Sequence, residues 1–428
     1  MLSTLRNAVK AEDTRKKILF TLMMFLVFRI GAHIPVPNID SNIINQLADQ
    51  AKLLGFFDMV SGGAFRNFSI FAMSITPYIN ASIIIQLLTV IVPRLEQLAK
   101  EDRKKIVEYT RYLTVVLAFI QAIGVSFGFR SALVSDSFGS IALIALTLTA
   151  GTACLMWIGE LITEKGIGNG ISLIIFAGIV SRLPHGLFTL YNFVVERGAM
   201  GFLIVLLFAV IALAAIVAVV AIQEGQRRIP VQYSRKIQGG SQLGGLGSTL
   251  PVKVNTANVM PIIFSSSLLQ FPLVIKQLIG ADPKGAAGFI FNALNQSNWC
   301  NPDHWNWSIG LIVYLLLNVV FAYFYTSITF NPLEISNNMK KQGGYIPGVR
   351  PGKATVDYLN SILTYIIFIG AVGLCIVAVI PIFFNGFFGA NVSFGGTSII
   401  IIAGVVLETM KQIESQTLVR QYTGFLTE

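Results

Sequence analysis

Charged residues are scarce in this sequence. Only 12% of its 428 residues are charged, whereas 54% are hydrophobic and the mean hydropathy is +0.70. So few charges cannot cover the surface of a soluble globular protein of this size. A helix needs about 20 apolar residues to cross a bilayer, and such runs recur along the whole chain. We therefore expect a helical protein that crosses the membrane many times.

Cysteine and histidine are also rare. The three cysteines are scattered over two apolar runs and one loop, which excludes a disulfide framework and indicates small apolar filler. The three histidines fall in or beside loops and are far apart in the sequence. Their separation argues against a zinc site or a proton relay, so the sequence predicts neither a metal nor an organic cofactor.

Ionisable groups are nearly absent from the middle of the apolar runs. Pumps and coupled transporters usually carry such groups at mid-membrane. We also find no paired carboxylates, no nucleophile with a base and no phosphate-binding loop, so we predict that the protein is not an enzyme. Arg29, inside the first run, is expected to snorkel to the nearer membrane surface.

The apolar runs predict ten membrane spans, and the basic residues predict their orientation. Most of the 31 lysines and arginines fall in the two termini and in alternate loops. Such an excess marks the cytoplasmic side, so both termini are expected there, and anionic lipids would attract the same loops. The predicted spans are 18–34, 74–92, 112–129, 141–161, 169–183, 201–222, 257–278, 307–328, 358–380 and 394–411.

Ten spans divide naturally into two halves of five. We expect an N-terminal half, 1–183, and a C-terminal half, 201–428, joined by an external hinge loop at 184–200. Halves with an odd number of spans insert in opposite senses, so an inverted repeat is geometrically possible.

Two cytoplasmic loops, 223–256 and 329–357, are longer than a tight connection requires. Both combine arginine or lysine with proline, glycine and tyrosine. This composition suits the docking of a soluble partner. A role of the basic residues in setting membrane orientation alone explains this composition about equally well.

A short segment, "SGGAFRNFSIF" (61–71), precedes the second span. It contains two glycines and an arginine and is too short to cross the membrane. One interpretation is a broken helix that re-enters the protein, because irregular backbone at membrane depth must be enclosed. The other is an amphipathic helix that lies on the outer surface.

Seven stretches, in chain order, resemble the SecY family, the channel subunits of the bacterial protein-export translocon. The resemblance covers essentially the whole chain, and several motifs are too long for chance agreement. The stretches are "VFRIGAHIPVP" (27–37), "SGGAFRNFSIFAMSITPYINASIIIQLLTV" (61–90), "MWIGELITEKGIGNGISLIIFAGIV" (156–180), "QRRIPVQY" (226–233), "LPVKVN" (250–255), "FNPLEISNNMKKQGGYIPGVRPG" (330–352) and "FGGTSIIII" (394–402).

The resemblance implies an all-α clamshell of two pseudo-symmetric halves around an hourglass pore. It also implies a lateral gate between spans 2–3 and 7–8, and a plug helix that fills the outer funnel. The plug would comprise Ser61, Gly62, Gly63, Ala64, Phe65, Arg66, Asn67, Phe68, Ser69, Ile70 and Phe71. The apolar ring at the waist would comprise Ile75, Ile79, Ile175, Ile263, Ser267 and Ile401, of which only the serine is polar.

The gate spans contain polar side chains that are able to hydrogen-bond between helices. These are Gln86, Gln121, Ser265, Ser266 and Gln270. For the basic loops, the family implies docking of the SecA motor or the ribosome through Arg227, Arg228 and Arg350. Arginine suits such contacts because its planar fork binds carboxylates and phosphates alike.

By the same resemblance, the protein would pass unfolded secretory preproteins across the bacterial plasma membrane and release nascent membrane segments into lipid. SecE and SecG would be its partner subunits, and no small-molecule substrate is expected. A secondary transporter for an uncharged solute is the alternative, because the span count permits it. A membrane hydrolase would need a polar constellation that the sequence lacks.

One stretch departs from the family pattern. The tip of the first basic loop, 239–248, is glycine-rich and uncharged, a composition typical of a flexible linker. We interpret it as a replacement of the usual basic tip. Docking at this tip is therefore in doubt, whereas docking through Arg350 is still expected.

Overall fold

The computed structural model describes residues 11–39, 61–134, 137–233, 236–238, 241–243, 248–279, 285–300, 302–388 and 396–424. The helices are α2 (Glu12–Gly31), α5 (Thr76–Ile91), α6 (Pro93–Glu101), α7 (Arg103–Gly128), α8 (Phe138–Lys165), α9 (Gly170–Glu224), α10 (Met260–Ile279), α11 (Ala286–Leu294), α12 (Ile309–Thr329), α13 (Pro332–Lys341), α14 (Lys353–Phe388) and α15 (Gly396–Gly424). The strands are β1 (Gln226–Tyr233), β2 (Lys236–Gln238), β3 (Ser241–Leu243), β4 (Ser248–Lys253) and β5 (Gly344–Tyr345).

Each predicted span coincides with one of these helices or, for the fifth and sixth spans, with part of α9. Asparagine caps two of the helices: the side chain of Asn169 accepts from Ile171 N at the start of α9, and Asn331 accepts from Leu333 N at the start of α13. Within the described ranges, five helices are long and apolar enough to cross a membrane. A sixth joins them if α5 and α6, bent by 108°, form one span. The number ten stays a prediction.

The stretch 184–200 is not the loop that we expected, while its role as a hinge stays a prediction. The chain is helical throughout this stretch except at Gly198, which has a φ of 56° and a ψ of −136°. We began the loop at Pro184, but a proline inside a membrane helix is tolerated where its neighbours satisfy the freed backbone groups. The two arms of α9 pack together near the bend through Phe193 and Phe208.

The all-α prediction misses a small antiparallel sheet in the order β4-β1-β5. β1 pairs along β4, with Ile229 opposite Leu250, and its end pairs with β5, where Gln232 is opposite Tyr345. The two basic loops are therefore parts of one structure. β2 and β3 form a separate ribbon that approaches the glycine-rich tip, of which 239–240 and 244–247 lie outside the described residues.

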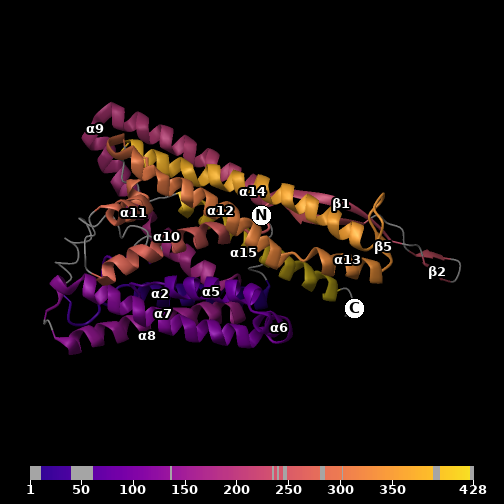
Figure 1. Ribbon diagram of the computed structural model, residues 1–428, viewed down its shortest axis with the longest axis horizontal. Helices are drawn as coiled ribbons and strands as arrows, with labels where there is room; N and C mark the ends of the chain where they lie inside the picture. The colour runs from indigo at the N-terminus through magenta and orange to yellow at the C-terminus, as the bar shows by residue number, and fades with distance from the viewer. Residues whose placement is uncertain are drawn as a thin grey trace.

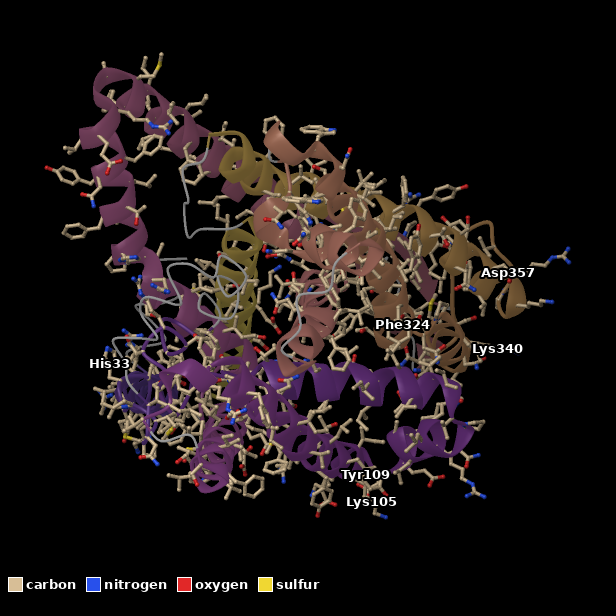
Figure 2. The ribbon with its side chains drawn as sticks, turned by 60° about the vertical axis from the view of Figure 1, so that its left-hand side comes forward. His33, Lys105, Tyr109, Phe324, Lys340 and Asp357 are labelled. Carbon is tan, nitrogen blue, oxygen red and sulfur yellow. The ribbon has the colours of Figure 1, made fainter. Side chains whose placement is uncertain are left out.

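The helices form two groups that follow the order of the chain (Figure 1). α2, α5, α7 and α8 lie side by side, α10, α12, α14 and α15 lie beside them, and α9 contacts α8 from one group and α14 and α15 from the other. The sheet, α6, α13 and the end of α15 lie toward one end of the molecule, and the bend of α9 lies at the other (Figure 1). Figure 2 likewise shows His33 far from Lys340 and Asp357.

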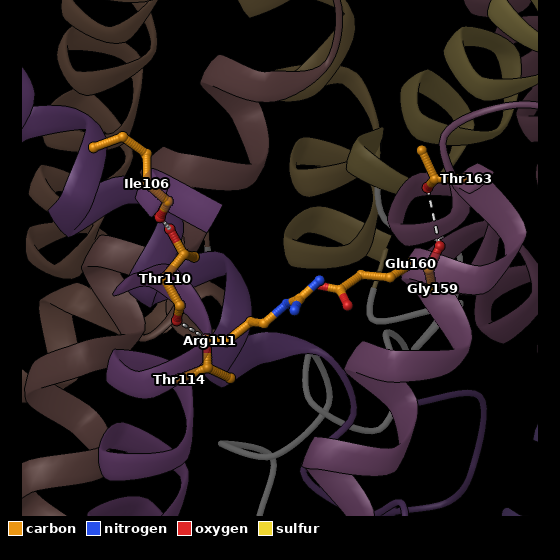
Figure 3. A network of polar contacts seen from close by, with 7 residues as sticks. All are labelled: Ile106, Thr110, Arg111, Thr114, Gly159, Glu160 and Thr163. Atoms are coloured by element: carbon orange, nitrogen blue, oxygen red, sulfur yellow. Dashed lines mark hydrogen bonds and ion pairs between the residues drawn. The ribbon is translucent and has the colours of Figure 1, made fainter. Parts of the chain in front are cut away.

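Polar contacts join neighbouring helices. Glu160 of α8 accepts from Arg111 of α7 at 2.8 Å, next to a series of threonine hydroxyls bonded to their own helices (Figure 3). Elsewhere, Glu224 of α9 pairs with Lys411 of α15 at 2.7 Å, and Glu408 of α15 accepts from Asn258, just before α10, at 2.9 Å. These contacts tie neighbouring helices into blocks.

The bend of α9 generates the first prediction. An alanine at Gly198 would meet nothing within 4 Å, so its cost is the positive φ alone, about 1–3 kcal/mol. We expect Gly198→Ala to lower the thermal unfolding midpoint of the purified protein in detergent. Gly139→Ala is the control, because its Cβ would make only an ordinary 3.9 Å contact with Ser137 in the first turn of α8. Equal midpoints for the two variants would contradict this account of the bend.

Candidate functional site

The segment from 61 to 75 lies inside the protein, which contradicts the surface-helix interpretation. Apart from half-buried Arg66 and exposed Asn67, its larger side chains are mostly buried, and Phe68 is 1% exposed. The predicted helix is also wrong, since the segment is a succession of turns. Positive φ angles interrupt any helix, and they occur at Gly62, Gly63, Phe68 and Ser74.

Hydrogen bonds satisfy the irregular backbone of this segment. The Val36 amide, just beyond α2, donates to the carbonyl of Phe68, and the Ile70 amide donates to that of Ile34, both at 3.0 Å. Within the segment, the Ser69 amide donates to the Ala64 carbonyl at 2.9 Å. Buried non-helical backbone is stable only when its polar groups find such partners.

Aromatic packing holds the segment against the first group of helices. The rings of Phe65 and Phe68 contact Phe129, at the end of α7, with centroids 5.8 and 5.5 Å away. Phe71 stacks on Phe28 of α2 at 6.2 Å. A Cβ added at Gly151 of α8 would collide with the carbonyl of Ile70, so this helix position must be glycine for the segment to approach so closely.

The isoleucines of the predicted apolar ring lie in one large hydrophobic cluster, and the ring itself stays a prediction. All five isoleucines are buried in one hydrophobic cluster, to which α9, α10, α15 and the start of α5 contribute. Ala64 and Phe71 of the 61–75 segment belong to the same cluster. Ser267, the polar member, is 2% exposed, and its hydroxyl has no hydrogen-bond partner in the described structure. The five isoleucines of the predicted ring are Ile75, Ile79, Ile175, Ile263 and Ile401.

α10 contacts both α5 and α7, so the helices of the predicted lateral gate touch along this seam. The bonds of two gate side chains stay within their own helices: Gln86 donates to Ser82 at 3.1 Å, and Ser265 donates to the carbonyl of Pro261 at 2.8 Å. The Ser266 hydroxyl and the Gln270 carbonyl oxygen are buried and without a partner among the described residues. Gln121 is also buried. Gln86 and Ser265, which are able to bond between helices, therefore bond within their own helices.

The predicted docking residues lie on the joined basic loops. Arg227 and Arg228 are exposed on β1, while Ile229 and Val231 of the same strand are buried against α12, α13 and α14. Arg350 is also exposed, beyond β5. The alternation of polar and apolar residues in β1 was a signal for a strand that sequence reasoning missed.

Sequence reasoning also missed two side chains that bond to the 61–75 segment. Arg29 of α2 and Ser181 of α9 both donate to the Gly62 carbonyl.

The three cysteines are free thiols, and burial raises the pKa of the Cys300 thiol. In the part of the chain that the structure describes, no three histidine, cysteine or acidic side chains form a metal-ligand group.

Comparisons with known proteins agree with this geometry. A family model described as SecY matches residues 69–410. Over the full length of both chains, the sequence is 46% identical to protein translocase subunit SecY of Halalkalibacterium halodurans and 42% identical to that of Bacillus subtilis.

Solved structures show a similar fold. One is a protein-conducting channel, with a TM-score of 0.69 and 18% identity, and another is Sec61 in the canine ribosome–channel complex from the endoplasmic reticulum, with a TM-score of 0.65 and 17% identity. Each match covers 93% of this chain and 91% of the other. From its family match and its full-length relatives, this multi-pass membrane protein belongs to the SecY family of protein translocase subunits.

Proposed function

We propose that this chain forms the protein-conducting channel of a Sec translocon and passes unfolded secretory polypeptides across the plasma membrane. SecY is a family of channel subunits rather than of enzymes. The observation that carries the proposal is the shared cluster in which Ala64 and Phe71 of the 61–75 segment pack with the five isoleucines. An apolar constriction and the segment that blocks it then belong to one closed site.

The constriction accounts for passage without ion leakage. Isoleucine side chains are flexible and apolar, so they can close around a polypeptide and exclude water when it is absent. In this proposal, the turns of 61–71 are the plug, and the positive φ angles let it fold compactly beside the waist. A related structure concerns a SecY plug domain that stabilises the closed channel of that protein.

The seam between α5, α7 and α10 is the proposed lateral gate. Among the described residues, Gln86 and Ser265 bond within their own helices, so separating the helices leaves these two hydrogen bonds intact. Hydrogen bonds between membrane helices contribute only about 0.6–2 kcal/mol each in any case. Opening this seam would release apolar segments into lipid. The helical bend at Gly198 replaces the loop 184–200 as the proposed hinge between the two halves.

The end of the molecule that carries the β4-β1-β5 sheet, α6 and α13 is the proposed cytoplasmic face, with both termini on that side. SecA or a ribosome would dock on the joined loops through Arg227, Arg228 and Arg350, and SecE and SecG would complete the complex. One structural neighbour, Sec61, is itself part of a ribosome–channel complex. The replaced glycine-rich tip makes the loops around Arg350 the stronger candidate for docking.

Deletion of 61–71 tests the plug. The shortened channel, purified with its partner subunits, should conduct ions at rest in a planar bilayer because nothing fills the waist. Since Phe65 and Phe68 also stabilise the first group of helices, Phe65→Ala with Phe68→Ala is a milder variant that should leak less. Phe138→Ala, which changes a phenylalanine 87% exposed, is the control. A tight channel after the deletion would mean that the segment is not a plug.

Arg350→Glu tests the docking loop. Reversal of this exposed charge should abolish SecA-driven export of a preprotein into membrane vesicles, while the complex with SecE still assembles. Lys353→Glu is a matched control, because Lys353 is also basic, exposed and only three positions away. Export that survives Arg350→Glu, or fails equally in both variants, would remove the specific role assigned to Arg350.

A further inference from the structure

Arg29 does not merely snorkel from the first span to the membrane surface. Its guanidinium donates from Nη1 to the carbonyl of Gly62, 33 positions further along the chain, at 3.1 Å. The side chain is half-buried in α2, whose neighbour Phe28 is fully buried against Phe71. A cationic group in the first span is thus directed at the backbone of the plug.

The Gly62 carbonyl has a second, weaker donor. The Ser181 hydroxyl lies 3.2 Å from it but only 2.7 Å from the carbonyl of Gly178, one turn earlier in α9. A hydroxyl has a single proton, which these two acceptors must share. The Arg29 bond carries a full positive charge, and charge-assisted hydrogen bonds are roughly twice as strong as neutral ones. Arg29 is therefore the stronger of the two donors.

The turn at Gly62 packs so closely against α9 that no side chain fits between them. Gly62 has a φ of 66°, and a Cβ there would lie 2.8 Å from the Cα of Gly178 and 2.7 Å from the Ser181 hydroxyl. Gly63 also has a positive φ, of 88°, but a Cβ there would approach nothing closer than 3.7 Å. The close contact is specific to the residue whose carbonyl Arg29 binds.

We propose that Arg29 is a positioning residue that latches the plug in the closed channel through the Gly62 carbonyl. This inference rests on the proposed role of 61–71 as a plug. Backbone hydrogen bonds to Val36 and Ile34 hold the segment at Phe68 and Ile70, whereas the Arg29 bond fixes its beginning, the Gly62 carbonyl, between α2 and α9. Displacing the plug breaks the bond and leaves a half-buried guanidinium without this acceptor, so Arg29 raises the free energy of opening.

Conductance of the resting channel, purified with its partner subunits, measures the latch. Arg29→Met keeps the length of the side chain and removes the charge and the donor, so resting ion conductance in planar bilayers should rise about tenfold, given what hydrogen bonds to charged groups contribute. Arg29→Lys keeps a cationic donor and should restore most of the closure. Arg130→Met, at an exposed arginine just beyond α7, should conduct like the unaltered channel.

Two further comparisons distinguish loss of the Arg29–Gly62 bond from a general loss of packing around the plug. Gly62→Ala and Gly63→Ala carry the same backbone strain, but only the first displaces the turn from α9, so Gly62→Ala should leak more. In the channel that lacks 61–71, Arg29→Met should add nothing, because residues that act through one element are not additive. An equal leak from the two alanine variants, or added conductance in the shortened channel, would overturn the latch.

The plug and the latch fail differently. If deletion of 61–71 leaks and Arg29→Met does not, the latch is wrong and the plug stands. If the deletion itself stays tight, the plug is wrong and the latch falls with it. The thermal unfolding midpoint of each variant must lie well above the assay temperature, so that an observed leak comes from incomplete closure and not from unfolding.

Discussion

Irregular backbone at the depth of a membrane has to be enclosed by protein and hydrogen-bonded, and the rest of this structure depends on how 61–75 meets that constraint. The amide of Val36 and the carbonyl of Ile34 provide partners beyond α2, and Arg29 provides another from within it. The glycine at position 151 lets α8 approach the segment. Two helices, α2 and α8, thus fit around one stretch of turns, and Ala64 and Phe71 of this stretch lie in the same cluster as the isoleucines.

Polar and apolar contacts are distributed differently over the helices. Ion pairs and charged hydrogen bonds join neighbouring helices, as between Arg111 of α7 and Glu160 of α8 or between Lys411 of α15 and Glu224 of α9. The isoleucine cluster draws on helices of both groups. Apolar contact has no directional requirement, and its free energy scales with buried area at about 25 cal/mol per Å². Two blocks can therefore part and close again without exchanging specific bonds.

Hydropathy located the long apolar helices, because a bilayer imposes a length that soluble folds do not, but it missed the short helices α6, α11 and α13. The waist isoleucines came only from the family resemblance, since a single isoleucine in a membrane helix looks the same whether it faces lipid or a pore. The helical course of 184–197 was not predicted, since the expected fifth span ends before it. The β1–β5 pairing and the Arg29–Gly62 bond join residues far apart in the sequence, and the positive φ of Phe68 follows from packing that no local pattern encodes.

The most direct test of this account asks whether a polypeptide passes through the isoleucine cluster. A photo-crosslinking residue at Ile79 would be used with a secretory chain stalled during SecA-driven translocation, and with a ribosome-stalled chain in parallel. The account predicts a crosslink to Ile79 and none to a matched probe at Leu206, which is exposed on the second arm of α9. Crosslinks at Leu206 with none at Ile79, from either stalled chain, would place the path elsewhere and contradict it.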